Sequence, residues 1–204
     1  MDKDQLILAS QSPRRAQTLE YLGVHFFQWA PAFDENLVQA EGQSINEFLI
    51  QLVDSKRSQW HQAWLQDQGT HISDQQLVCC ADTLIVLDGQ MIGKPDDDAM
   101  AREVLTALSG RAHQVMTCVA IGNAEAVESV ITSTQVYFRP LTASTINGYI
   151  ASGEGQDKAG AYGLQGLGGA LVDRVEGSVS GVVGMPMAET LDLLNHWQIP
   201  HRLR

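Results

Sequence analysis

Two acidic residues, Asp82 and Glu35, stand where a carboxylate could do chemistry. Asp82 falls between two apolar runs, residues 77–81 and 84–87, at an apparent strand end. An acid there is costly unless it is exposed in a cleft, paired or bound to a metal ion. Glu35 lies in a predicted loop, residues 31–36. Both offer the oxygen ligands that Mg²⁺ or Mn²⁺ prefers, and an acid that activates water beside a metal-held phosphate is a hydrolytic device. The spacing alone also allows Asp82 to be a turn residue that hydrogen-bonds its own loop.

The second candidate is the segment Ser10-Gln11-Ser12-Pro13-Arg14-Arg15, which follows a short apolar run at residues 6–9. We predict a strand over that run, then a helix with Ser12 as its N-cap, Pro13 at its first position and Gly23 at its end. A helix N-terminus directs backbone N–H groups at an anion, and hydroxyl and guanidinium groups suit phosphate oxygens. The alternative is an ordinary capped helix with surface arginines. We favour a phosphate clamp formed by this segment.

Other basic residues occur at turn-forming sequences in a chain whose formal net charge is −11. Lys94 lies in Gly-Lys-Pro, Arg111 in Ser-Gly-Arg, and Lys158 in Asp-Lys-Ala-Gly. Any one of them could simply be an exposed turn residue, but their grouping weakens that interpretation. The acidic excess argues against general binding to nucleic acid or anionic membranes. A small phosphorylated ligand would need only a local positive pocket or a metal ion held by carboxylates.

The remaining pattern predicts mixed strands and helices in one α/β domain over residues 1–204. A capping box at Ser44 and Glu47 begins a helix that carries Lys56 and runs to about residue 65. Asp96 is predicted to cap a helix that ends at residue 108. A glycine-rich segment, residues 153–169, contains Gln165 and suits a loop whose backbone approaches a ligand closely. Further strands are predicted over residues 24–29, 114–121, 128–138 and 171–175, and further helices over 142–150 and 186–196.

Several common kinds of site are excluded because the chain lacks their motifs. It has no G-x-x-x-x-G-K-[ST], no G-x-G-x-x-G after the first strand, no H-E-x-x-H and no G-x-S-x-G. The three cysteines, two of them adjacent, are predicted to be buried reduced thiols. His113 and the four tryptophans are predicted to be structural. No apolar run reaches membrane-spanning length and the N-terminus lacks a signal-peptide pattern, so we expect a cytoplasmic protein.

The order of these motifs resembles the Maf family over nearly the whole chain. The run from Ile7 to Arg15, I-L-A-S-Q-S-P-R-R, is similar to the opening motif of the family. Each later match is short, but their shared order is highly specific. These matches are Asp34-Glu35, Lys56, Ala81-Asp82-Thr83, Gly93-Lys94-Pro95, the run L-S-G-R-x-H-x-V from Leu108 to Val115, the run D-K-A-G-A-Y-G-L-Q-G from Asp157 to Gly166, and Gly177-Ser178 with Val182-Val183-Gly184-Met185-Pro186.

The resemblance implies a fold, a reaction and a set of roles. The fold would be Maf/ITPase-like α/β, with an elongated, twisted mixed β-sheet flanked by helices, a central cleft and a homodimeric assembly. The reaction would be hydrolysis of a nucleoside triphosphate to the monophosphate and pyrophosphate with a divalent cation, Mg²⁺ or Mn²⁺. Asp82 would accept the proton and, with Glu35, hold the metal. The phosphate contacts would come from Ser10, Arg14, Arg15, Lys56 and Lys94, with Lys158 as a possible addition.

The branch of the family that acts on dTTP and UTP resembles this chain most. It carries Arg, Thr and Gln where this sequence has Arg14, Thr83 and Gln165, and a side-chain amide can pair with the imide edge of uracil or thymine. Cys80 stands where the family has glycine before Asp82, and Met185 where it has leucine. Two alternatives stay open: the same reaction on 7-methyl-GTP or another modified nucleotide, and a regulator of septum formation that binds a partner.

Overall fold

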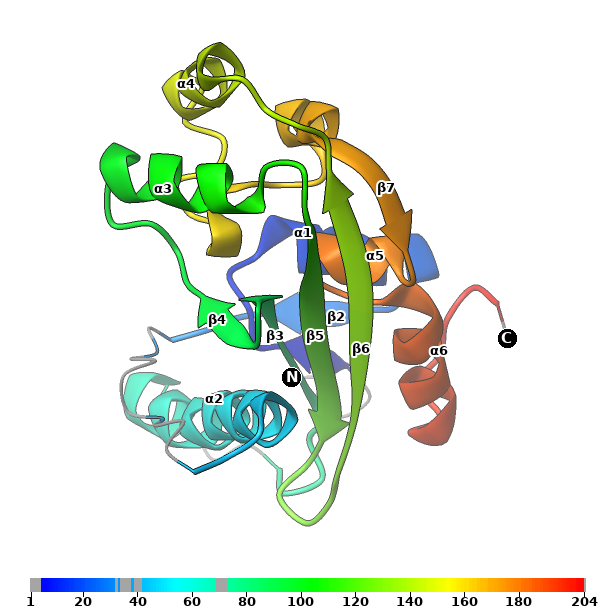
Figure 1. The fold of residues 1–204 in the computed structure, drawn as a ribbon. Coiled ribbons are helices and arrows are strands. Elements are labelled where there is room, and N and C mark those ends of the chain that lie inside the picture. The colour runs from blue at the N-terminus through cyan, green and yellow to red at the C-terminus, as the bar shows by residue number, and fades with distance from the viewer. Residues whose placement is uncertain (1–4, 32, 34–37, 39–41, 69–72, 204) are drawn as a thin grey trace. The chain divides into compact units, whose positions relative to one another are not determined.

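A computed structural model describes residues 5–31, 33, 38, 42–68 and 73–203 (Figure 1). Its strands are β1 (Leu6–Leu8), β2 (Phe26–Gln28), β3 (Val78–Leu87), β4 (Gln90–Ile92), β5 (Ala112–Gly122), β6 (Val127–Phe138) and β7 (Val172–Glu176). The helices of the described residues are α1 (Pro13–Leu22), α2 (Ile45–Gln68), α3 (Asp98–Leu108), α4 (Ala143–Ala151), α5 (Val179–Val183) and α6 (Met187–His196), together with the 3₁₀ helices η2 (Ala159–Ala161) and η3 (Gly166–Leu171). Within the described residues, no helix combines the length and apolar character needed to cross a membrane.

The strands form one mixed sheet, in the order β2-β1-β3-β5-β6-β7, with β4 paired to β3 outside this path. The strand β1 runs parallel to both β2 and β3, with Leu6 opposite Phe26 and Ile7 opposite Val78. The pairs β3–β4 and β6–β7 are antiparallel. The prediction of a mixed α/β fold is therefore confirmed.

The chain divides into two compact units, each with its own hydrophobic core. Unit 1 comprises Met1–Asp82, Cys118–Ile131 and Gly184–Arg204, and unit 2 comprises Thr83–Thr117 and Thr132–Val183. Three of the strands, β3, β5 and β6, contribute residues to both units. The prediction of a single domain stays a prediction.

The core of unit 1 forms around the start of the sheet and the helices α1 and α6, which contact each other. An aromatic cluster belongs to the same unit. Trp60 and Trp64, one turn apart on α2, stack with ring centroids 5.3 Å apart, and Trp60 donates its indole N–H to the Trp29 carbonyl at 2.9 Å. Both side chains are buried, which confirms their predicted structural role. The three cysteines, Cys79, Cys80 and Cys118, are free and buried, as predicted.

The core of unit 2 forms between α3, α4, η2 and the strand segments of that unit. The helices α3 and α4 contact each other, as can be followed in green and yellow-green in Figure 1. His113 is buried and lies 2.8 Å from the hydroxyl of Tyr162, in edge-on contact with the Phe138 ring. Its predicted structural role is therefore confirmed.

Two local predictions about element boundaries are corrected. The apolar runs around Asp82 belong to one continuous strand, β3, so Asp82 is not at a strand end. Threonine favours β-structure, and pairing with β1 on one segment and β4 on the other holds the strand together. The N-cap of α3 is Asp97, whose side chain accepts the Met100 N–H at 2.8 Å, rather than Asp96. The short helix α5 had no local signal that predicted it.

Candidate active site

The turn between β1 and α1 places Ser10 at the start of a helix. Ser10 is 6% exposed, and its hydroxyl oxygen accepts the Ser12 backbone N–H at 3.2 Å. Gln28, on the neighbouring strand β2, donates its side-chain amide to the Ser10 carbonyl at 2.8 Å. Ser12 is the N-cap and Pro13 the first helical residue, as predicted, but the Ser12 side chain makes no capping hydrogen bond to the described helix. The first amides of α1 are therefore not capped by that hydroxyl.

Arg15 joins this turn to a second segment of unit 1. Its Nη1 donates to the Ser10 hydroxyl at 3.2 Å and its Nε to the Gly184 carbonyl at 3.1 Å. The third nitrogen, Nη2, lies 3.8 Å from an Asp82 carboxylate oxygen. Burial lowers the pKa of Arg15, and the Asp82 charge opposes that effect. A guanidinium that uses all three nitrogens in this way has a fixed orientation.

Asp82 is the centre of the polar cluster in unit 1. Lys56, from α2, donates a hydrogen bond to one carboxylate oxygen, while Arg15 faces the other. The side chains of Asp82, Lys56 and Arg15 are 14%, 18% and 15% exposed, so the cluster is partly shielded yet reachable. The Lys56 ammonium group also lies 5.2 Å from the centre of the Phe33 ring. Lys56 and Arg15 thus bring two positive charges to the Asp82 carboxylate in an otherwise acidic chain.

Four of the residues predicted from sequence thus come together in unit 1: Ser10, Arg15, Lys56 and Asp82. Arg14 is half-buried in the first turn of α1, where its carbonyl accepts the Thr18 hydroxyl at 3.2 Å. Glu35 lies outside the described residues, so its predicted role as a metal ligand stays a prediction. The chemical roles of the four clustered residues also stay predictions.

Four other predicted residues belong to unit 2. The Thr83 hydroxyl lies 3.0 Å from that of Thr117, which donates to the Gly181 carbonyl at 2.8 Å. Lys94 is exposed, in a turn whose Gly93 carbonyl accepts the Gly160 N–H at 3.0 Å. The Lys158 ammonium group donates to the Glu154 carbonyl and to Asp157. Gln165 is exposed and is the N-cap of η3.

The glycine-rich segment is packed closely against itself. A Cβ atom on Gly168 would lie 2.1 Å from the Gly163 carbonyl oxygen, and one on Gly166, whose φ is +81°, would lie 2.5 Å from a Glu154 oxygen. In the described structure these glycines therefore allow the loop to pack tightly against itself. The sequence predicts a close approach of this backbone to a ligand.

Sequence reasoning missed the residues that hold these segments. Gly184 and Gln28 position Arg15 and Ser10, and Glu154 and Tyr149 bind the backbone around Gln165. Gly184 acts through a carbonyl, which gives no signal in the residue type. Glu154 had one signal, an acidic residue between glycines, but that pattern is also typical of an exposed turn.

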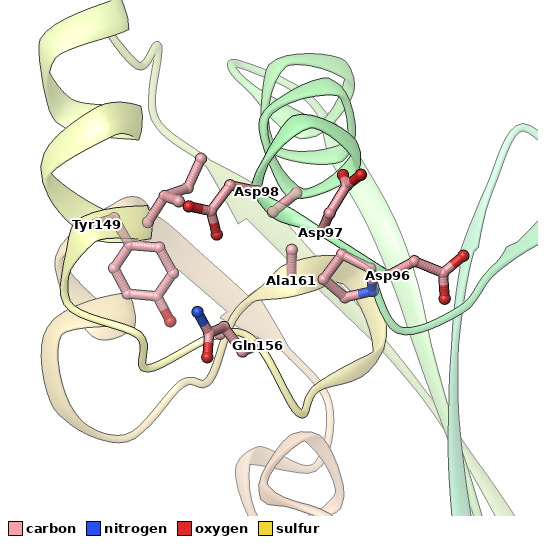
Figure 2. Close-up of a pocket in the computed structure, with 10 residues that line it drawn as sticks. Asp96, Asp97, Asp98, Tyr149, Gln156 and Ala161 are labelled. Carbon is pink, nitrogen blue, oxygen red and sulfur yellow. The ribbon is translucent and has the colours of Figure 1, made fainter.

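A cavity of about 250 Å³ lies within unit 2, between α3 and α4. Figure 2 shows Asp96, Asp97 and Asp98 on one side of it and Tyr149 and Gln156 on the other. Three neighbouring carboxylates repel a triphosphate, so this cavity does not suit that anion.

Asp82 is the carboxylate with donor chemistry that fits a hard divalent cation. Mg²⁺ is commonly held by one or two carboxylates together with substrate phosphates, and the Asp82 carboxylate supplies oxygen ligands of this kind. Among the residues that the structure describes, no group of three His, Cys, Asp or Glu side chains could hold a metal by itself. A metal there would thus need oxygens from the substrate or from residues outside that set.

Comparison with known proteins agrees with these features. The family model described as Maf-like protein matches residues 5–197. A dTTP/UTP pyrophosphatase of Pasteurella multocida is 42% identical over 192 residues, which cover 93% of this chain and 94% of that protein. Proteins of the same name from Vibrio vulnificus and Alcanivorax borkumensis are each 43% identical, covering 94% and 96% of this chain and 98% and 97% of their own lengths. The sequence motifs, the mixed α/β fold and these matches over nearly the full length establish that the chain belongs to the Maf family.

Proposed function

We propose that this protein hydrolyses dTTP and UTP to the nucleoside monophosphate and pyrophosphate. The observation that carries the proposal is the Asp82 carboxylate held between Lys56 and Arg15, beside Ser10 and the N-terminus of α1. This cluster offers an acid, two cations and helix amides within one unit. The names and near-complete coverage of the relatives support the choice of dTTP and UTP.

The phosphate groups would be bound by the basic and hydroxyl side chains of the cluster. Arg15 and Lys56 would neutralise the negative charge that develops on phosphate oxygens, with Ser10 and Arg14 at the helix start. Arg15 is already oriented by Ser10 and Gly184, which lowers the entropic cost of binding. We assign Lys94, and Lys158 as a possible addition, to the same group on the strength of the family resemblance.

Asp82 would act as the general base. It would take one proton from the attacking water, whose oxygen forms a bond to phosphorus as the anhydride bond breaks and the two products separate. A divalent cation, Mg²⁺ or Mn²⁺, held by Asp82 and Glu35, would supply charge neutralisation of the phosphates when bound. The carboxylate of Asp82 would need to exchange part of its contact with Lys56 for the water.

The choice of base would depend on Arg14, Thr83 and Gln165. Gln165 is exposed, and its amide has both a donor and an acceptor, which match the carbonyl and N–H of the uracil and thymine imide edge. Thr83 would act through its hydroxyl, which already contacts Thr117.

The direct test is pyrophosphate release from dTTP, UTP, CTP, dATP, GTP and 7-methyl-GTP, with and without Mg²⁺ or Mn²⁺. We expect metal-dependent release mainly from dTTP and UTP, and a loss of about a thousandfold or more in kcat for Asp82→Asn. Asp192→Asn, an exposed change on α6, is the matched control and should keep the wild-type rate. Preference for 7-methyl-GTP would overturn the base assignment, and a folded Asp82→Asn with the wild-type rate would overturn the mechanism.

We also propose a cytoplasmic homodimer. Three buried, free thiols are compatible with a reducing compartment, where disulfides are rare. The dimer is inferred from the family resemblance, and light scattering of the purified protein tests it.

A further inference from the structure

Glu154 is a half-buried acid of unit 2 that lies outside the proposed chemistry and yet has an unusual set of contacts. One carboxylate oxygen, Oε2, accepts the Leu167 backbone N–H at 2.8 Å. The other, Oε1, accepts the Gly168 N–H at 2.8 Å and the Tyr149 hydroxyl at 3.1 Å. Both oxygens of the carboxylate are therefore engaged, and two of the three bonds go to consecutive amides of η3.

The first amides of a helical turn have no partner within the helix, and a short polar side chain at the N-cap commonly binds one of them. The N-cap of η3 is Gln165, and its side chain makes no capping hydrogen bond. Glu154 binds the amides of Leu167 and Gly168 instead, from 13 and 14 residues earlier in the chain. The Gln165 side chain is exposed and takes no part in capping this turn.

Tyr149 extends the same network to the other side of Gln165. Its hydroxyl donates to Glu154 and accepts the Gly163 N–H at 3.1 Å, while its side chain is buried against the unit 2 core. The backbone is thus held two residues before Gln165 and two residues after it. Gly166 and Gly168 leave no room for a Cβ atom, so the loop has little freedom between these points.

We propose that Glu154, with Tyr149, is a positioning residue for base selection: it fixes the loop so that the Gln165 amide is presented to the pyrimidine base. The part of this inference that concerns the pyrimidine base rests on the proposed function. Glu154 itself does not contact the base; it acts through the backbone on both sides of Gln165.

The ionisation of Glu154 agrees with this role. Partial desolvation of the carboxylate favours the protonated form, but the Gly168 and Leu167 amides and the Tyr149 hydroxyl outweigh it, and the pKa of Glu154 lies below its usual value. Glu154 is therefore a carboxylate, an acceptor at both oxygens, throughout the neutral range. An amide in its place would turn one acceptor into an N–H donor that faces another donor.

The experiment is a double-mutant cycle in which the measured quantity is the preference for one base over another. The ratio of kcat/KM for UTP to kcat/KM for CTP is measured for wild type, Glu154→Gln, Gln165→Ala and the double variant. We expect each single change to lower the ratio by about tenfold, because either change removes the hydrogen bond between the Gln165 amide and the base, and we expect the double variant to lower it no further. Glu103→Gln, an exposed change on α3, is the matched control and should leave the ratio unchanged.

Three outcomes would overturn the proposal. A purely structural role for Glu154 would reduce activity on UTP and CTP alike and leave the ratio at its wild-type value. Full additivity of the two changes would place Glu154 in a role separate from Gln165. If Glu154→Gln does not fold, Tyr149→Phe takes its place, because it removes one hydroxyl; an unchanged ratio in that folded variant would also contradict the positioning role.

Failure of the proposed function is recognised separately. If wild type releases pyrophosphate from none of the nucleotides, the reaction assignment is wrong, and hydrogen exchange of the loop then decides the structural claim alone. We expect the Leu167 and Gly168 amides to exchange at least about tenfold faster in Glu154→Gln than in wild type. Equal exchange rates would overturn the claim that Glu154 holds this loop.

Discussion

The ammonium group of Lys56 donates a hydrogen bond to the carboxylate of Asp82, which joins α2 to β3 inside unit 1. The other oxygen of Asp82 faces Arg15. An acid with a cation on each side is held in one orientation, and both cations are near enough to act on a phosphate bound beside it.

Replacing Lys56 tests how much the cation contributes. We expect Lys56→Met to lower kcat/KM for dTTP by roughly 10- to 100-fold, because a charge-assisted contact to phosphate is lost. Lys56→Arg keeps the charge and should lose much less. Steady-state kinetics on both variants provides the comparison, and a Lys56→Met enzyme within about twofold of wild type would contradict the assignment.

Arg15 is expected to matter for stability as well as for catalysis. Arg15→Lys removes the Nε bond to the Gly184 carbonyl and the fork that reaches Ser10 and Asp82, so we expect the free energy of unfolding to fall by about 1–3 kcal/mol. Urea unfolding followed by circular dichroism measures the loss. Arg14→Lys, at the adjacent helix position, is the control and should change stability by less than about 0.5 kcal/mol.

His113 makes the stability of the protein sensitive to mild acid. Burial lowers its pKa from 6.5 to about 4 in the folded state. Well above pH 6.5 the His113 imidazole is neutral in both the folded and the unfolded protein. As the pH falls towards 4, this imidazole takes up a proton in the unfolded protein but not in the folded protein, so the free energy of unfolding decreases. The difference amounts to about 3 kcal/mol.

The His113→Gln variant isolates this effect, because glutamine does not titrate and can still bond to the Tyr162 hydroxyl. The difference between the free energies of unfolding at pH 7.5 and pH 4.5 should therefore be smaller in the variant than in wild type. His196→Gln, an exposed change, is the control. The same pH dependence in His113→Gln and wild type would show that His113 is not the source.

The cysteines are expected to resist alkylation. Burial raises the pKa of Cys79 and Cys118 to about 12 and also raises that of Cys80. At pH 8 the thiolate fraction of Cys79 and Cys118 is then more than about a thousandfold below that of an exposed cysteine. Mass spectrometry after iodoacetamide should show no modified cysteine in the native protein and three in urea. Rapid modification of the native protein would contradict the burial of these thiols.

Local signals in the sequence predicted those elements whose cause is local. The Ser44–Glu47 capping box is formed, with the Ser44 N–H donating to the Glu47 carboxylate at 2.8 Å, and α2 begins at the next residue. The Pro13 start and Gly23 end of α1 are also as predicted. These features depend on residues within one turn of each other, so a single sequence is enough to read them.

Features that depend on contacts between residues far apart in the chain are harder to predict from a single sequence. The polar pair Asp82-Thr83 predicts a break between two strands, because no nearby residue indicates that β3 pairs with β1 and β4. Three successive aspartates, Asp96 to Asp98, stand at the start of α3 and are equivalent as caps in sequence, so only the backbone geometry selects Asp97. Glu154 reaches amides 13 and 14 residues away, and no local period links those positions.

All four tryptophans of the chain, Trp29, Trp60, Trp64 and Trp197, lie in unit 1. Tryptophan fluorescence therefore reports on that unit alone, while the far-ultraviolet circular dichroism of the backbone reports on both. The stacked pair Trp60 and Trp64 adds a signal of its own, since coupled indole rings produce paired bands of opposite sign. The chain thus carries a natural optical label on one half. Coincidence or separation of the two unfolding curves would reveal whether the halves melt as one cooperative body.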